Sequence, residues 1–141
     1  GLNSRLDELH AAILSVKLRK LDANNKRRGR LAEIYQRELR VIPEIRLPRT
    51  RASAKHIFHL FVIEAERRNE LQAHLHKYGV ATLVHYPIAI HKQKAFSKFN
   101  TLTLPVVEKR VTTLLSLPCN PELSETAARF ICKEIRSFYR R

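Results

Sequence analysis

The sequence predicts an α/β (α+β) fold, in which one long N-terminal helix leads into a small sheet of about three strands covered by helices. Through the first 40 residues, apolar side chains recur every three to four positions, which is the period of a helix with a buried stripe. After residue 43, runs rich in β-branched and aromatic residues alternate with helical segments, which is typical of a sheet with helices packed on it. The chain of 141 residues, of which 44% are hydrophobic, is long enough to bury such a core as one unit.

The first helix is expected over residues 5–40, ending before Pro43. Two apolar stripes lie side by side on its first half, so this half is expected to need cover on two sides. A bend is expected near Gly29, because glycine costs about 1 kcal/mol relative to alanine inside a helix. If the two stripes stay uncovered, they form an exposed apolar patch. Such a patch drives association, so we expect the chain to self-associate through this helix. The patch consists of Leu6, Leu9, Ile13, Leu14 and Leu18.

Strands and helices are expected to alternate in the rest of the chain. Gly79 favours the positive φ that ends a helix, Pro105 suits the first turn of the next, and Ser124 is a good N-cap for the last. Phe130 is expected to face inward from this last helix. The expected strands are residues 56–63, 80–84 and 115–117, and the expected helices are residues 67–78, 91–99, a segment from 105, and 124–140.

The chain is strongly basic, with 27 Lys and Arg against 13 Asp and Glu and a formal net charge of +14. Such a surface favours anionic partners, namely nucleic acid, an acidic membrane surface or phosphorylated small molecules, although a basic face without a specific partner is also compatible with it. The run from Lys26 to Arg30 could follow a nucleic-acid backbone, but base-stacking aromatic residues and a helix-turn-helix pattern are both missing. A solvated helix face is the simpler interpretation of this run, and nucleic acid is not the expected partner.

The sequence favours a cytoplasmic protein without a bound metal or a membrane segment. The longest apolar run has four residues, no signal peptide is expected, and the two cysteines lack the spacing of a zinc site. Cys132 is expected in the core rather than as a nucleophile. His74 and His76 lie two apart on a helix and so point to different faces, and no third ligand is identifiable for His85 and His91.

The turn that follows the second expected strand is the strongest candidate for a ligand site. His85, Tyr86 and Pro87 stand at the end of this strand, where α/β proteins tend to place ligand groups, and His91 follows closely. Two imidazoles and a phenol are costly to bury without partners. The alternative is a rigid turn with hydrogen-bonded histidines in the core.

Several segments together resemble one family. Residues 1–7 resemble the G-x-N-x-R-[LM] segment found midway through the pyridoxal-phosphate-dependent nucleotide-sugar aminotransferases of the DegT/DnrJ/EryC1/StrS type. The later matches follow in the family's order, and together they cover essentially the whole chain and the C-terminal part of the family only. They are His59–Ile63, Arg67–Leu71, Gly79–Val80, the turn from His85 to His91, Leu104–Glu108 and Ser116–Ser124.

The resemblance implies the small domain of a fold-type-I aminotransferase that works as a homodimer. Residues 1–42 would form a long helix that joins a missing large domain, and residues 43–141 would form the small C-terminal α/β domain. The family's cofactor is pyridoxal 5'-phosphate, and its lysine belongs to the large domain. No lysine of this chain matches the family's lysine motif, so the chain is expected to be inactive alone and to hold no catalytic residue. The intact enzyme would transfer an amino group, with glutamate as the expected donor, to a keto-sugar nucleotide.

The resemblance also assigns site residues. Asn3 would hold the cofactor phosphate in the partner subunit's site, and Arg5 would lie close to it. His85 and Tyr86 would border the sugar-nucleotide pocket, with His91 beside them. This chain has Ala89 where the family often has a second proline in the turn, which affects the course of the loop that carries His91.

Two other interpretations of the sequence remain open at this stage. One is a free-standing, non-catalytic module that uses its basic face to bind nucleic acid or a protein partner, which steep salt dependence of binding would reveal. The other is a folded but inactive remnant of an aminotransferase.

Overall fold

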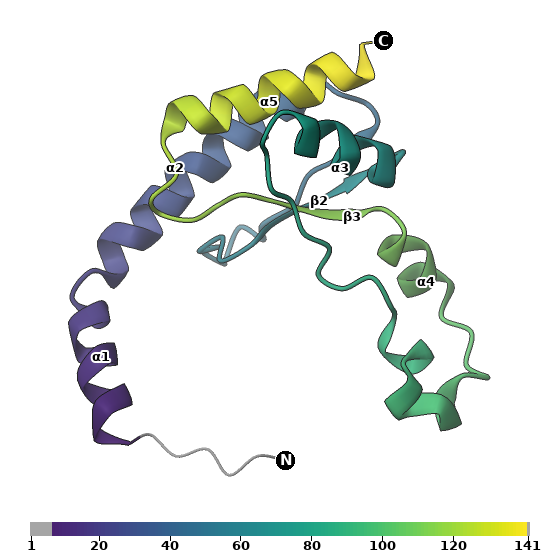
Figure 1. The fold of residues 1–141 in the computed structure, drawn as a ribbon, viewed down its shortest axis with the longest axis horizontal. Helices are drawn as coiled ribbons and strands as arrows, with labels where there is room; N and C mark the ends of the chain where they lie inside the picture. The colour runs from purple at the N-terminus through teal and green to yellow at the C-terminus, as the bar shows by residue number, and fades with distance from the viewer. Residues whose placement is uncertain (1–6, 141) are drawn as a thin grey trace.

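The computed structural model describes residues 7–140, as an arched body from which two arms project on the same side (Figure 1). None of the helices described is long and apolar enough to cross a membrane. The elements in chain order are α1 (Glu8–Leu18), α2 (Leu21–Leu39), β1 (Ile45–Arg46), β2 (Phe61–Ala65), α3 (Arg68–Lys77), the 3-10 helices η1 (Ile90–Lys92) and η2 (Lys94–Phe99), α4 (Pro105–Val111), β3 (Leu114–Leu117) and α5 (Glu125–Tyr139).

The sheet has three antiparallel strands in the order β1-β2-β3, which confirms the expected small sheet covered by helices. Successive side chains of a strand point to opposite faces. Phe61 and Ile63 of β2 are therefore buried on one face together with their partners Leu117 and Leu115 on β3. Helices α2, α3 and α5 pack over this face, which leaves the opposite face of the sheet toward the hollow between the two arms (Figure 1).

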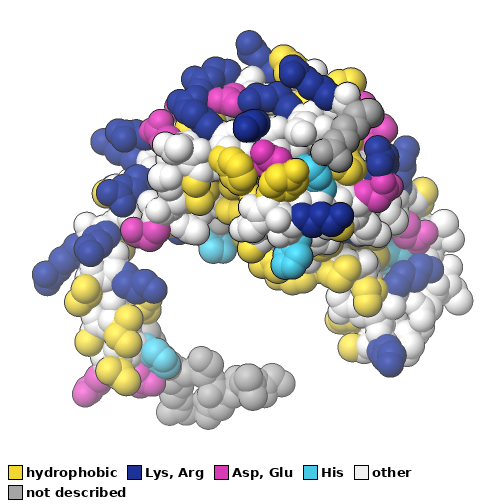
Figure 2. Space-filling model, turned by 45° about the horizontal axis from the view of Figure 1, so that its top comes forward, with side chains coloured by type: hydrophobic (Ala, Val, Ile, Leu, Met, Phe, Trp, Pro, Cys, Tyr) yellow, Lys and Arg dark blue, Asp and Glu magenta, His cyan; other side chains and the backbone are white. Residues whose placement is uncertain are grey.

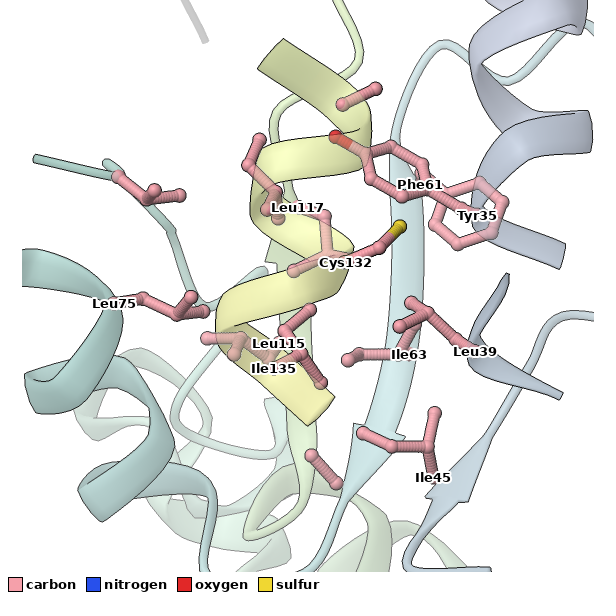
Figure 3. Close-up of a cluster of buried hydrophobic side chains, with 14 of the residues drawn as sticks. Tyr35, Leu39, Ile45, Phe61, Ile63, Leu75, Leu115, Leu117, Cys132 and Ile135 are labelled. Carbon is pink, nitrogen blue, oxygen red and sulfur yellow. The ribbon is translucent and has the colours of Figure 1, made fainter. Parts of the chain in front are cut away.

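The core lies between the sheet and these helices (Figure 3). Tyr35 and Leu39 enter it from α2, Leu75 from α3, and Cys132 and Ile135 from α5, and all five side chains are fully buried. The second half of α2 is thus part of the body, whereas none of the eleven residues of α1 is buried within the described chain.

The expected single helix bent near Gly29 is wrong. The chain forms two helices, and the break lies at Arg19 and Lys20, which cap α1 and α2. Gly29 lies inside α2 with open space where a Cβ would stand. Glycine weakens a helix without interrupting its hydrogen-bond ladder, so here it marks no bend.

The expected strands differ from the observed ones at their limits. β2 spans residues 61–65 rather than 56–63, because pairing begins opposite Leu117 and Phe58 has a positive φ of 49°. The expected strand 80–84 is wrong as a strand, since only Leu83 forms an isolated bridge, to Ser116 at the free edge of β3. The third strand is instead the short β1, which follows Pro43. The strand expected at 115–117 is confirmed as β3.

The helix signals in the second half of the chain are confirmed. Gly79 has φ of +74° just after α3, Pro105 starts α4, and the Ser124 side chain accepts a hydrogen bond from the Ala127 amide at 3.1 Å. The helix expected over 91–99 is present as the two short 3-10 helices η1 and η2.

The inward orientation expected for Phe130 is wrong, because its side chain is 40% exposed. Ile131, Ile135 and Phe138 follow one another at spacings of four and three along α5 and form the buried stripe. Phe130 precedes this stripe by one residue, a rotation of about 100° around a helix axis of 3.6 residues per turn, which turns its ring out of the core.

Replacing Tyr35 by phenylalanine is expected to lower the free energy of unfolding by about 1–2 kcal/mol. The buried Tyr35 hydroxyl donates a 2.7 Å hydrogen bond to the carbonyl of Pro118, and so ties α2 to the segment after β3. Removing the donor leaves that carbonyl without its partner. Urea unfolding of Tyr35→Phe measures the loss, and Tyr78→Phe, at a side chain that is 46% exposed, is the matched control. Equal stabilities of the two variants would contradict the prediction.

Candidate functional site

The candidate site is a pocket of about 260 Å³ at the end of β3. It is formed where β3 passes Leu83 on one side and the middle of α2 on the other. Its polar lining residues come from four separate segments of the chain. They are Arg28, His59, His85, Ser116 and Asn120.

His85 is held at this pocket by two sets of hydrogen bonds. Backbone hydrogen bonds join Leu83 and Ser116 in both directions, at 2.7 and 3.3 Å, and fix the segment that leads to His85. The His85 Nδ1 atom lies 2.8 Å from the Ser116 hydroxyl oxygen. Since Nδ1 is engaged in this way, a ligand in the pocket can form a hydrogen bond with His85 only through its Nε2 atom.

Tyr86 stands beside His85 with its ring edge-on to the imidazole, at 5.6 Å between ring centroids. Its side chain is 71% exposed. A tyrosine offers both an apolar ring and a hydroxyl to a partner. An exposed tyrosine next to the pocket can therefore extend the contact surface beyond the pocket itself.

His91 has a different environment from His85. Its side chain is only 6% exposed, and its Nε2 atom lies 2.8 Å from the Glu108 carboxylate. The same oxygen of Glu108 accepts a 3.0 Å hydrogen bond from the Leu104 amide, just before α4. These contacts lower the pKa of Glu108, with the Leu104 amide as the main cause and His91 next. Glu108 thus connects η1 to α4, and it stabilises the arm that contains these two helices.

Replacing Glu108 by glutamine is expected to loosen this arm without unfolding the body. Because folding lowers the pKa of Glu108, its stabilising contribution is complete above the pKa of an unfolded glutamate, about 4.3, and is lost as the pH falls through the lower folded pKa. The variant should therefore show, at neutral pH, the lower protection of the amides around residues 90–92 that the native chain is expected to show only in acid. Hydrogen exchange followed by NMR measures this, with the exposed Glu33→Gln as control. Unchanged exchange in Glu108→Gln would refute the coupling.

The described residues bring together only some of the residues expected from the sequence. His85 lines the pocket with Tyr86 next to it, whereas His91 is paired with Glu108, so the two imidazoles have different partners. Asn3 and Arg5 lie outside the described residues. The sequence analysis considers Arg28 only as part of the basic run Lys26–Arg30 and assigns no role in this pocket to Arg28, His59 or Asn120, which lie far apart along the chain.

The two cysteines are buried, and the ten lysines lie on the surface. Cys119 and Cys132 are free and buried, and burial raises their pKa values to about 11 and 12, so both are thiols at neutral pH and poor nucleophiles. The core position expected for Cys132 is confirmed. All ten lysines lie between residues 17 and 133, and each side chain is exposed. An exposed amine lacks the enclosed surroundings that activate a lysine for covalent bonding to a cofactor.

Residues 7–140 contain no group of three or more His, Cys, Asp and Glu side chains that could hold a metal ion. His74 lies near Glu134 of α5, at 3.8 Å, and its ring is tilted against that of Phe138, while His76 is exposed. The basic residues are spread over the outer surface of the body with acidic residues between them (Figure 2).

The chain is similar to one family of known proteins. The model of the DegT/DnrJ/EryC1/StrS aminotransferase family matches residues 1–136. The erythromycin biosynthesis sensory transduction protein EryC1 of Saccharopolyspora erythraea is 45% identical over 139 residues, which are 97% of this chain and 38% of that protein. The dTDP-3-amino-3,6-dideoxy-alpha-D-galactopyranose transaminase of Aneurinibacillus thermoaerophilus is 38% identical, over 98% of this chain and 38% of that protein.

A solved structure shows the same fold. The crystal structure of DesV from S. venezuelae, in complex with a ketimine intermediate, matches with a TM-score of 0.94 and 38% identity, over 100% of this chain and 38% of that chain. The chain thus spans about 38% of the length of the relatives that it matches. With a family match over nearly all of its residues, the chain belongs to the DegT/DnrJ/EryC1/StrS aminotransferase family.

Proposed function

We propose that this chain is the C-terminal portion of a pyridoxal-phosphate-dependent aminotransferase that acts on keto-sugar nucleotides. The observation that carries the proposal is the family match over residues 1–136, with a relative that is a transaminase of a dTDP-amino sugar. The relatives are longer than this chain, which accounts for about 38% of their length. The chain supplies substrate and cofactor contacts, and the rest of the enzyme supplies the covalent attachment of the cofactor.

The geometry around His85 and the family resemblance support the proposed roles. His85 and Tyr86 contact the sugar nucleotide, because one imidazole nitrogen is left to meet a ligand and the neighbouring phenol is exposed. His91 acts through Glu108 as a positioning residue that holds the turn on α4. Asn3 and Arg5 keep the role that the family resemblance implies, contact with the cofactor phosphate across a homodimer.

The described residues do not by themselves fit the covalent attachment of pyridoxal phosphate. When bound, this cofactor acts as the electron sink that makes amino transfer possible, and an enclosed lysine must hold it. Every lysine of this chain is exposed. The chain alone is therefore expected to show no transamination, and we place the cofactor's lysine in the part of the enzyme that corresponds to the unmatched length of the relatives.

A chimaeric enzyme tests the proposal. This chain replaces the matched C-terminal segment of the Aneurinibacillus transaminase, and the product is assayed for transamination of that enzyme's own sugar nucleotide. We expect turnover in the chimaera and none in the isolated chain mixed with pyridoxal phosphate. A folded chimaera that binds the cofactor but transfers no amino group to any keto-sugar nucleotide would overturn the proposal, as would transamination by the isolated chain.

Replacing His85 by glutamine in the active chimaera is expected to lower kcat/KM by about tenfold to a hundredfold, which corresponds to the loss of one hydrogen bond to a charged group. Steady-state kinetics with the sugar nucleotide measures the loss. The matched control is His76→Gln, at an exposed histidine of α3. A similar effect of both substitutions would contradict the contact assigned to His85.

A further inference from the structure

The pocket at the end of β3 differs in charge from two other pockets of the described residues. The pocket between β1, β2 and α4 mixes carboxylates with lysine and arginine side chains, and the pocket before α5 mixes carboxylates with arginine side chains. The pocket at the end of β3 is lined by one arginine and two histidines, Arg28, His59 and His85, and by no acidic side chain among the described residues. Its lining is therefore cationic or neutral throughout, despite the carboxylates elsewhere on the surface.

Arg28 has hydrogen-bond donors that the other described residues do not use. Its Nε atom is buried and has no hydrogen-bond partner in the part of the chain that the structure describes. Its Nη1 atom makes only a long contact, 3.4 Å, with the side-chain oxygen of Asn25. A guanidinium carries five N–H donors and no acceptor, and it pairs most strongly with a carboxylate or phosphate.

The neutral groups of the pocket are also oriented as donors. The side-chain oxygen of Asn120 accepts a 2.9 Å hydrogen bond from the Glu122 amide, so the remaining NH₂ group of Asn120 is the part that can meet a ligand. Ser116 is engaged with His85, which fixes the imidazole. The pocket thus combines charged and neutral donors that come together only in the folded chain.

The size of the pocket limits what it can hold. Its volume of about 260 Å³ lies below the roughly 300–1,000 Å³ of pockets that enclose a whole drug-sized molecule. The pocket therefore fits one end of a ligand. Because its polar groups are mainly hydrogen-bond donors, that end of the ligand must accept hydrogen bonds.

We propose that this pocket is an oxyanion subsite, which binds one carboxylate or phosphate group through Arg28, His59 and the Asn120 amide. The inference deepens the proposed function and rests on it for the origin of the anion. A sugar-nucleotide aminotransferase has two substrates that carry such groups, the phosphates of the nucleotide and the carboxylates of the amino donor.

The test uses the full 141-residue chain and needs no catalysis, so it can fail independently of the chimaeric enzyme. Inorganic phosphate and L-glutamate are each titrated into the chain at constant ionic strength, and the ring signals of all histidines are followed by NMR. We expect saturable shifts of the His59 and His85 signals, and no matching shift of the exposed His76. Saturation with phosphate alone assigns the subsite to the nucleotide, and saturation with glutamate alone assigns it to the amino donor. Linear, unsaturated shifts with both anions would overturn the proposal.

Neighbouring arginines on α2 provide a matched pair of variants. Arg28→Gln should weaken anion binding by at least about tenfold, since a hydrogen bond to a charged group contributes about 1.5–3 kcal/mol. Arg27→Gln removes the same charge from a residue outside this pocket and should leave the affinity nearly unchanged. Equal weakening by both variants would show general attraction to a basic surface and refute the subsite. His59→Gln, compared with His76→Gln, provides the same comparison if Arg28→Gln does not fold.

Discussion

Replacing Phe61 by alanine is expected to lower the free energy of unfolding by about 3–5 kcal/mol, the usual cost of removing a fully buried aromatic ring. Phe61 is 0% exposed, and it lies where the sheet, α2 and the segment before β2 meet. Its ring centroid is 5.0 Å from that of Tyr35 and 5.7 Å from that of Phe58. It also pairs in register with Leu117 of β3. A cavity at this position therefore removes contacts from three segments at once.

The loss is large relative to the total stability of about 5–15 kcal/mol that folded domains have. Guanidinium unfolding followed by circular dichroism measures it. The matched control is Phe130→Ala, which removes the same ring from the exposed side of α5 and should change the stability by no more than about 0.5 kcal/mol. If the two substitutions had equal effects, the assignment of Phe61 to the core would be wrong.

This pair of phenylalanines also shows how far the sequence could predict the fold. Local signals were sufficient where the deciding interaction is local. The Ser124 cap, the positive φ of Gly79 and the proline that starts α4 each act within one turn of their own residue. The prediction for Phe130 was wrong because Phe130 lies on the same broad arc of α5 as Ile131, Ile135 and Phe138. Only the position of the sheet decides which of these four side chains is buried.

Strand limits depended on partners far along the chain. The residues before Phe61 have a high β propensity, yet they form no strand, because β3 has only four residues and pairing ends with it. The segment at 80–84 reaches the free edge of β3 and pairs there through Leu83 alone. The β propensity of a segment does not predict how many residues of a partner strand are available to pair with it.

The candidate site was predicted only where its chemistry is contiguous. His85 and Tyr86 are neighbours in the sequence, and their residue types at a turn were sufficient to single them out. Arg28, His59 and Asn120 come together through the packing of α2 against the end of β3. One of them stood in a run that suggested a solvated basic face. Their convergence is a tertiary feature for which the sequence contains no spacing rule.

Helix α1 depends on contacts outside the body of this chain. It has eleven residues, none of them buried by the part of the chain that the structure describes, and isolated helices shorter than about 12–15 residues are marginal in water. Of the expected patch, Leu6 lies outside the described residues, and the other four side chains are exposed: Leu9 71%, Ile13 48%, Leu14 54% and Leu18 67%. A short helix with so many exposed apolar side chains gains stability only when another surface covers them, and in a solution of this chain alone the available surface is a second copy.

The isolated chain is therefore expected to self-associate through α1, and its helix should form together with the association. Across a concentration series, amide exchange within residues 10–18 should slow as light scattering detects dimers or larger species, while exchange in the core stays constant. Replacing both Ile13 and Leu14 by glutamate should weaken the association by at least about tenfold, since burying each such side chain contributes about 1.5–3 kcal/mol. Stability of the body should be unchanged, because α1 contributes no buried residue to it.

Val106→Glu, at a side chain of α4 that is 66% exposed, is the control for adding charge at an apolar surface position. A chain that remains monomeric at every concentration, with α1 amides already protected, would show that α1 is stable without cover and would contradict this prediction.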